Sequence, residues 1–92
     1  MKKLTLTVLT PAGAAAETEC SSVTLFARDN EAGQGGGSVG VRPGHLPAVI
    51  ALAPDSEVRA SSDGRVTLSV TVSGGFATVR DDKVTVVTES SR

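Results

Sequence analysis

Hydrophobic and polar residues alternate along much of the chain. Leucine or valine alternates with threonine across Lys3–Thr10, and valine or leucine alternates with threonine or serine across Val66–Ser73. A period of two places one set of side chains on a buried sheet face and the other in water. Residues branched at Cβ also suit a pleated strand. The pattern therefore predicts β-strands, with shorter repeats of it at Val23–Leu25 and Val84–Val86.

Turn residues interrupt the alternation at regular intervals. Pro11-Ala12-Gly13 ends the first strand, and Ser62-Asp63-Gly64-Arg65 contains the Asp-Gly pair that is typical of a tight hairpin. Arg80-Asp81-Asp82-Lys83 is a second hairpin candidate. The two hairpins are expected to pair Glu57–Ser61 with Val66–Ser73, and Phe76–Val79 with Val84–Thr88.

Two segments lack this alternation. Residues 28–38 are polar and rich in glycine, which predicts an exposed, flexible loop. Leu46–Leu52 is the only run with helical potential, and prolines on both sides favour something shorter. Many short strands without covering helices indicate an all-β sandwich or barrel, formed by residues 1–92 as a single domain.

Composition excludes several classes of function. Two Phe, no Tyr and no Trp leave almost nothing for base stacking or a sugar platform, and a net charge of −1 gives no basic field for nucleic acid. Cys20 is the single cysteine, so no internal disulfide is possible and a reducing compartment is expected. No run approaches the roughly 20 apolar residues that cross a bilayer, so direct membrane insertion is not expected.

The glycines before residue 41 fit the G-x-G-x-x-G pattern of phosphate loops, but the context argues against nucleotide binding. Such loops need a helix directly afterwards, whose free N–H groups meet the phosphates. Pro43 disfavours that helix, and Val41 stands where a P-loop has lysine. These glycines are expected to provide flexible spacing.

Catalysis has one candidate pair. Cys20 and His45 have the side chains of a nucleophile and its base, although Cys20, within the strand-like Glu19–Leu25, has the properties of a small core residue. The acidic residues are scattered through turns, so neither a metal site nor a cofactor site is expected. A small thiol or metal enzyme remains an alternative, and it requires Cys20 and His45 to adjoin.

The segment Pro43-Gly44-His45-Leu46-Pro47 predicts a rigid corner. The two prolines fix φ and Gly44 permits a turn, so Arg42 and His45 would point outward in a defined geometry. A purely structural corner with incidental polar tips is the alternative.

Three motifs carry a resemblance to a known family. Gly40-Val41-Arg42-Pro43-Gly44-His45-Leu46-Pro47 resembles the G-x-x-P-G-H-x-P signature of the epsilon subunit of F-type ATP synthases, called delta in mitochondria. Ser73–Val79 is similar to the family's S-G-G-F-x-E-V, and Lys83–Val87 to its N-x-V-T-V-L. With the first strands, the likeness covers nearly the whole chain, and three motifs in register are specific.

The resemblance implies a flattened β-sandwich of two sheets and a non-catalytic rotor role. Such a subunit packs against gamma and rests on the polar loops of the c-ring, as a peripheral protein at the cytoplasmic face of the membrane. By position, the implied ring contacts are Ser38, Arg42 and His45. The implied gamma contacts are Leu46, Pro47, Ile50, Gly74 and Gly75.

The sequence departs from the family in several ways. Ser38 replaces an acidic residue, Thr78 replaces the glutamate of the second motif, and the insert at Gly33–Gly37 is longer than usual. The chain stops at Arg92, where most members continue into a two-helix domain that inhibits ATP hydrolysis and in some bacteria binds ATP. Neither of those functions is expected here. A stand-alone β-sandwich interaction module without a rotor role remains an alternative.

Overall fold

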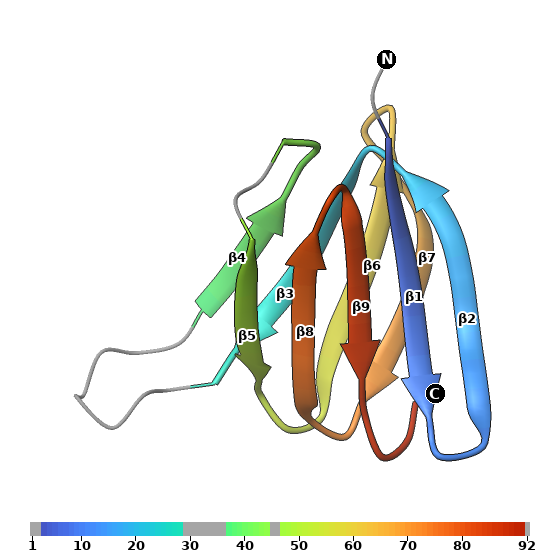
Figure 1. Ribbon diagram of the computed structural model, residues 1–92, viewed down its shortest axis with the longest axis vertical. Coiled ribbons are helices and arrows are strands. Elements are labelled where there is room, and N and C mark those ends of the chain that lie inside the picture. The colour runs from blue at the N-terminus through green and yellow to red at the C-terminus, as the bar shows by residue number, and fades with distance from the viewer. Residues whose placement is uncertain (1–2, 29–36, 45–46, 92) are drawn as a thin grey trace.

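A computed structural model describes residues 3–28, 37–44 and 47–91, and within these ranges the chain is all-β (Figure 1). The strands are β1 Leu4–Thr10, β2 Gly13–Cys20, β3 Ser22–Ala27, β4 Gly37–Val41, β5 Ala48–Leu52, β6 Ser56–Ser62, β7 Arg65–Val72, β8 Gly75–Arg80 and β9 Lys83–Val87. The prediction of an all-β domain is confirmed.

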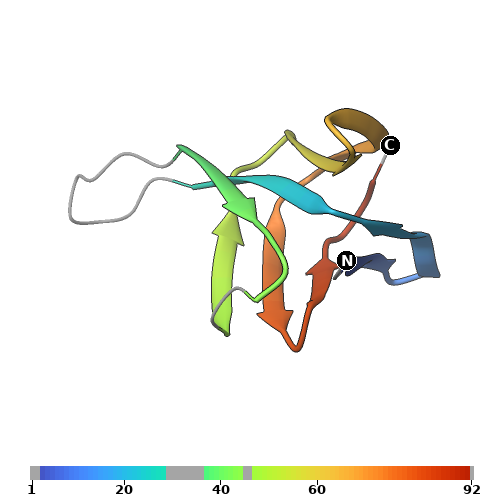
Figure 2. The same ribbon diagram turned by 90° about the horizontal axis from the view of Figure 1, so that it is seen from above.

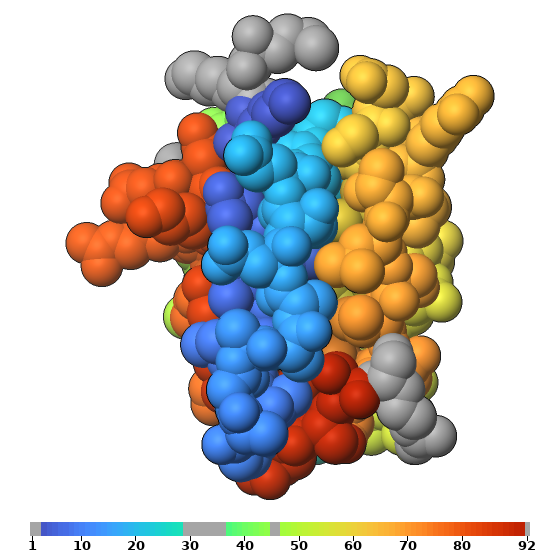
Figure 3. Space-filling model, turned by 90° about the vertical axis from the view of Figure 1, so that its right-hand side faces the viewer, coloured from blue at the N-terminus to red at the C-terminus, as the bar shows by residue number. Residues whose placement is uncertain are grey.

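The strands form two layers of a sandwich that share one hydrogen-bonded path. The first layer runs β2-β1-β9-β8-β5, and the second runs from β3, which also pairs with β4, through β6 to β7. A single register pair, Ala27 with Leu52, joins the layers at β5 and β3. The ladder ends at β2 and at β7, whose surfaces adjoin on the side shown in Figure 3, while Figure 2 shows the layers from above.

Alternate positions of both layers fill the space between them. Because successive side chains of a strand point to opposite faces, the apolar set of each strand reaches one shared core. The buried apolar residues are Leu4, Leu6, Val8, Cys20, Val23, Leu25, Val41, Leu52, Val58, Ala60, Val72, Ala77, Val79, Val84 and Val86.

Both expected hairpins are present, with the turns that their sequences favour. Asp63 and Gly64 have φ of 52° and 80°, and Asp81 and Asp82 have φ of 51° and 60°. Two positive φ values match the right-handed twist of the flanking strands, and Asp, Asn and Gly accept them most readily.

Three sequence-based boundaries differ from the structure. Glu19–Leu25 is not one strand, because Ser21 separates β2 from β3 and its N–H donates to the Ser61 carbonyl as the chain changes layers. The run with helical potential forms β5 instead, pairing with β8 through five residues. Gly37 and Ser38, expected in the flexible loop, begin β4, and residues 29–36 lie outside the described residues.

Candidate functional site

Apolar side chains form a row across the outer face of the first layer. The register places Ala51 opposite Phe76, Phe76 opposite Val87, and Val87 opposite Leu9. Opposite residues of neighbouring strands have Cβ atoms about 5 Å apart, so the four side chains form one continuous strip. Phe76 is 51% exposed and Val87 42%.

One further apolar side chain enlarges this strip. Val49 of β5 is 75% exposed and lies two residues before Ala51, on the same face. Leu9, Val49, Ala51, Phe76 and Val87 together make a surface that we call the docking face. Exposed contiguous apolar patches are typical of surfaces that bind another macromolecule, so the docking face is the candidate site.

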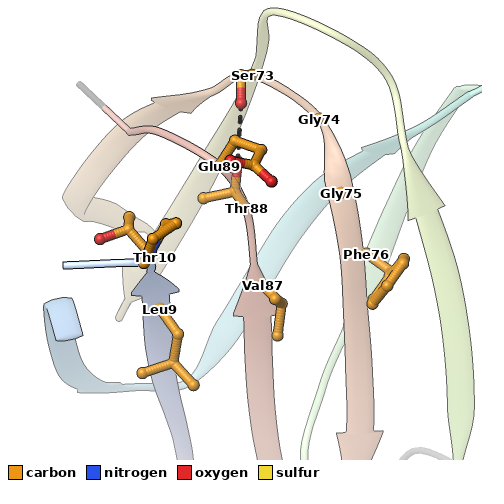
Figure 4. A pocket seen from close by; sticks show the side chains of 10 residues that line it. Leu9, Thr10, Ser73, Gly74, Gly75, Phe76, Val87, Thr88 and Glu89 are labelled. Atoms are coloured by element: carbon orange, nitrogen blue, oxygen red, sulfur yellow. Dashed lines mark hydrogen bonds between the residues drawn. The ribbon is translucent and has the colours of Figure 1, made fainter. Parts of the chain in front are cut away.

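The docking face is hollowed at the end where β8 begins and β1 and β9 end. A groove of about 430 Å³ is lined by Leu9, Phe76 and Val87 together with Gly74 and Gly75. Its lining also includes Thr10, Pro11, Ser73, Thr88 and Glu89. Figure 4 shows the three apolar side chains and the glycines around it. The groove is open and largely apolar, which suits a protruding side chain of a protein partner.

The outer face of the second layer differs in chemistry. Its phenylalanine, Phe26, lies under the guanidinium of Arg59 at 5.5 Å from the ring centroid, and Glu57 contacts Arg59 at 2.6 Å. Leu68 and Val70 of β7 pack against the core, so Ser69 between them and the flanking Thr67 and Thr71 face outward. The two layers therefore present an apolar face and a polar face.

Most residues expected to contact gamma lie around the docking face. Gly74 and Gly75 line the groove, and Pro47 is exposed where the chain enters β5. Ile50 is half-buried and packs against the core, so its neighbour Val49 occupies the outward position. Leu46 lies outside the described residues.

Gly75 fits only a residue without a side chain. Its φ is +108°, and a Cβ there would overlap the Val87 carbonyl oxygen and lie 3.1 Å from Thr88 Cα. The absence of a side chain at Gly75 thus allows the backbones of β8 and β9 to approach closely.

The corner before β5 has a clear anchor. Arg42 is exposed, and Pro43 and Gly44 form a turn in which Gly44 has φ of +86°. The Gly44 N–H donates to Oδ1 of Asp82 at 2.7 Å. His45 lies outside the described residues. Ser38 is exposed in β4, four residues before Arg42, so about 13 Å of extended strand separates these two expected ring contacts.

Cys20 is a core residue at the end of β2. It is 1% exposed, and burial raises the pKa of its thiol. Because the thiolate is the reactive form, both effects suppress nucleophilic chemistry. A thiol enzyme would need Cys20 and His45 to adjoin. Because His45 lies outside the described residues, that requirement stays a prediction. Among the described positions, no three His, Cys, Asp or Glu residues gather as metal ligands would.

We expect Cys20 to resist thiol reagents in the folded protein. Its labelling at pH 8 should be at least about a hundredfold slower than in denaturant, because reaction requires local opening of the sandwich. Following the labelling by mass spectrometry at increasing urea concentrations measures this difference. Equal rates with and without urea would contradict burial of the thiol.

The alternation pattern alone did not reveal the outward apolar residues of β5 and β9. Their signal is present in places where two apolar residues are consecutive, as with Val86 and Val87. In a strand, one of two such neighbours must face outward. Consecutive apolar positions therefore place one apolar side chain on an outer face, where a side chain of the same protein covers it, as Arg59 covers Phe26, or a partner can.

No helix in the described part of the chain has the length and apolar character that crossing a bilayer requires.

Comparisons with known proteins match the chain to one domain of ATP synthase delta/epsilon chains. Residues 3–91 match the family model of the ATP synthase delta/epsilon chain β-sandwich domain. The ATP synthase epsilon chains of Bacillus thuringiensis and Bacillus anthracis are 40% identical over 91 residues, which cover 99% of this chain and 62% of each relative. The chain thus spans less than two thirds of these relatives.

Solved structures show the same fold. A chain in the OSCP/F1/c-ring structure of the Euglena gracilis mitochondrial ATP synthase has a TM-score of 0.76 and 27% identity, over 98% of this chain and 52% of that one. A chain in the central stalk/c-ring structure of the Tetrahymena thermophila mitochondrial ATP synthase has a TM-score of 0.71 and 15% identity, over 99% and 66%.

Proposed function

The chain belongs to the family of ATP synthase delta/epsilon β-sandwich domains, and from this premise we propose that it is a central-stalk subunit of a rotary, proton- or sodium-driven ATP synthase. In this role it has no catalytic residues of its own. It links the gamma subunit to the c-ring, as a peripheral protein at the cytoplasmic face of the membrane. A stiff sandwich suits this task because hydrogen-bonded ladders in two packed layers resist shear.

The observation that carries the proposal is the apolar strip on the first layer. Three of the four large apolar side chains exposed in the described residues, Val49, Phe76 and Val87, lie on the docking face, and the fourth, Val66, lies on β7 of the second layer. A permanent partner such as gamma would cover the docking face. Phe76 is its central anchor, because a half-exposed aromatic ring has much area left to bury. Pro47, Val49, Gly74 and Gly75 extend the proposed gamma contact.

The Arg42–Gly44 corner is the proposed ring contact. It lies at the end of the sandwich where β8 turns into β9, away from the groove end of the docking face (Figure 1). Arg42 there is exposed and charged, and His45 follows in the sequence. Ser38, on the exposed side of β4, extends this proposed contact along the edge of the second layer. Gamma and the ring would then use separate surfaces of one small domain.

Binding to purified gamma tests this function. The chain should co-elute with its cognate gamma subunit in size-exclusion chromatography at micromolar concentration, and a gamma–c-ring preparation should retain it. Failure to bind gamma at such concentrations would contradict the rotor role and favour a stand-alone interaction module. Binding to gamma without any added retention by the ring would contradict the ring contact alone.

A further inference from the structure

Asp82 is tied at both its backbone and its side chain. Its carbonyl oxygen accepts the Thr5 N–H at 3.0 Å, and its carboxylate accepts the Gly44 N–H at 2.7 Å. The first bond fixes the β8–β9 turn to β1. The second therefore fixes the corner, 38 residues earlier in the chain, to the first layer of the sandwich.

The two aspartates of this turn have different environments. Asp81 is exposed, and its carboxylate lies 3.8 Å from Nε of Arg80. Asp82 is half-buried, and its carboxylate is turned toward the corner. Both have φ between 50° and 60°, which aspartate, asparagine and glycine accept. The turn alone thus does not require a carboxylate at position 82, whereas the bond to Gly44 requires an acceptor there.

The corner needs this hydrogen bond from outside because its own backbone makes few hydrogen bonds. Pro43 has no N–H, and Gly44 at φ +86° lies outside strand geometry. A hydrogen bond from an N–H to an ionised carboxylate is shorter and stronger than one between neutral groups. Through it, the turn that follows the exposed Arg42 is held to the β8–β9 turn, whose flanking residues Arg80 and Lys83 are also exposed.

We propose that Asp82 is a positioning residue for the ring contact: its carboxylate clasps the corner onto the β8–β9 turn, so that both meet the ring as one preformed surface. This inference rests on the proposed function. Without this bond the corner samples other conformations. The apparent affinity for the ring then falls in proportion to the fraction of molecules whose corner keeps the binding-competent conformation.

A matched set of variants isolates the clasp. Asp82→Gly keeps the turn geometry and removes the acceptor, whereas Asp82→Asn keeps both. Asp81→Gly changes the same turn without touching the corner. We expect the Gly44 amide to exchange with solvent about tenfold faster in Asp82→Gly, with a smaller increase in Asp82→Asn, which keeps a neutral acceptor, and no change in Asp81→Gly. Amide exchange measured by NMR on the full 92-residue chain reports this without any partner.

Binding completes the test. A gamma–c-ring preparation should hold Asp82→Gly about fivefold more weakly than wild type, while affinity for gamma alone stays the same. Asp82→Asn should restore most of the ring affinity, because the neutral amide oxygen still accepts the Gly44 N–H. Equal ring affinity of Asp82→Gly and wild type, or unchanged Gly44 exchange, would overturn the positioning role. If even the wild-type chain is not retained by the ring, the ring contact itself fails, and the positioning role fails with it.

Discussion

Replacing Gly75 with alanine is expected to lower the free energy of unfolding by about 3–5 kcal/mol. An added Cβ would overlap the Val87 carbonyl oxygen, and φ of +108° is itself a conformation that alanine avoids. A domain of this size has a total stability of about 5–15 kcal/mol. The single methyl group therefore removes a large part of the stability, or all of it.

The backbone opposite Gly75 has little freedom to move away. The Thr88 N–H donates to the Leu9 carbonyl at 3.0 Å, and the Thr88 hydroxyl donates to the Ser90 carbonyl at 3.1 Å. Because the Thr88 hydroxyl proton is already donated to Ser90, the Ser73 hydroxyl must be the donor in its hydrogen bond to the Thr88 hydroxyl. Figure 4 shows this bond. The Ser90 N–H closes the ring by donating to Ser73 Oγ. Moving Val87 and Thr88 outward would break several of these bonds together.

Two other glycines provide controls in urea unfolding experiments. Gly74 has φ of +129° but leaves 3.8 Å to the nearest atom, so Gly74→Ala should cost only the backbone strain, about 1–2 kcal/mol. Gly40 faces open space without a positive φ, and Gly40→Ala should change stability by less than about 0.5 kcal/mol. A Gly75→Ala protein within 1 kcal/mol of wild type would contradict the close approach of β8 and β9.

The sequence was sufficient to predict the strands with clear alternation and both hairpin turns, but not β2, β4 and β5. Alternation is predictive because it is local. Lys3–Thr10 and Val66–Ser73 each need only their own residues to define a buried side. The Asp-Gly and Asp-Asp turns are local in the same sense, since their positive φ values depend on side chains at those two positions. Such strands and turns can be predicted without knowing which strands become their neighbours in the sheet.

Pairing across long sequence separations could not be predicted in this way. The row from Ala51 to Leu9 exists because β5, β8, β9 and β1 become neighbours in that register, and nothing local specifies that order. The bond between Gly44 and Asp82 has the same origin. The segment at β5 forms a strand and not a helix for the same reason. Its five residue pairs with β8 outweigh a weak local preference for a helix.

Replacing Phe76 with aspartate should abolish binding to gamma while leaving the domain folded. The ring is the aromatic anchor of the docking face, and its removal alone is expected to cost about 2–3 kcal/mol of binding free energy. An aspartate in its place adds a charge that the partner surface would have to desolvate. We expect affinity for gamma to fall by at least about a hundredfold in calorimetry. Because Phe76 is 51% exposed in the free chain, its contribution to folding is small.

Val66→Asp is the matched control for this substitution. Val66 is 54% exposed, nearly the same as Phe76, but it lies on β7 of the second layer, near the hairpin turn. If binding depends on the docking face, Val66→Asp should change gamma affinity less than about twofold. Equal losses of affinity for the two variants would mean that added negative charge alone weakens the complex. Unchanged affinity of Phe76→Asp for gamma would rule out the first layer as the gamma contact. The Gly44–Asp82 bond lies beyond the other end of the strand that holds Phe76, so Gly44 amide exchange should stay normal in Phe76→Asp and confirm that the sandwich is intact.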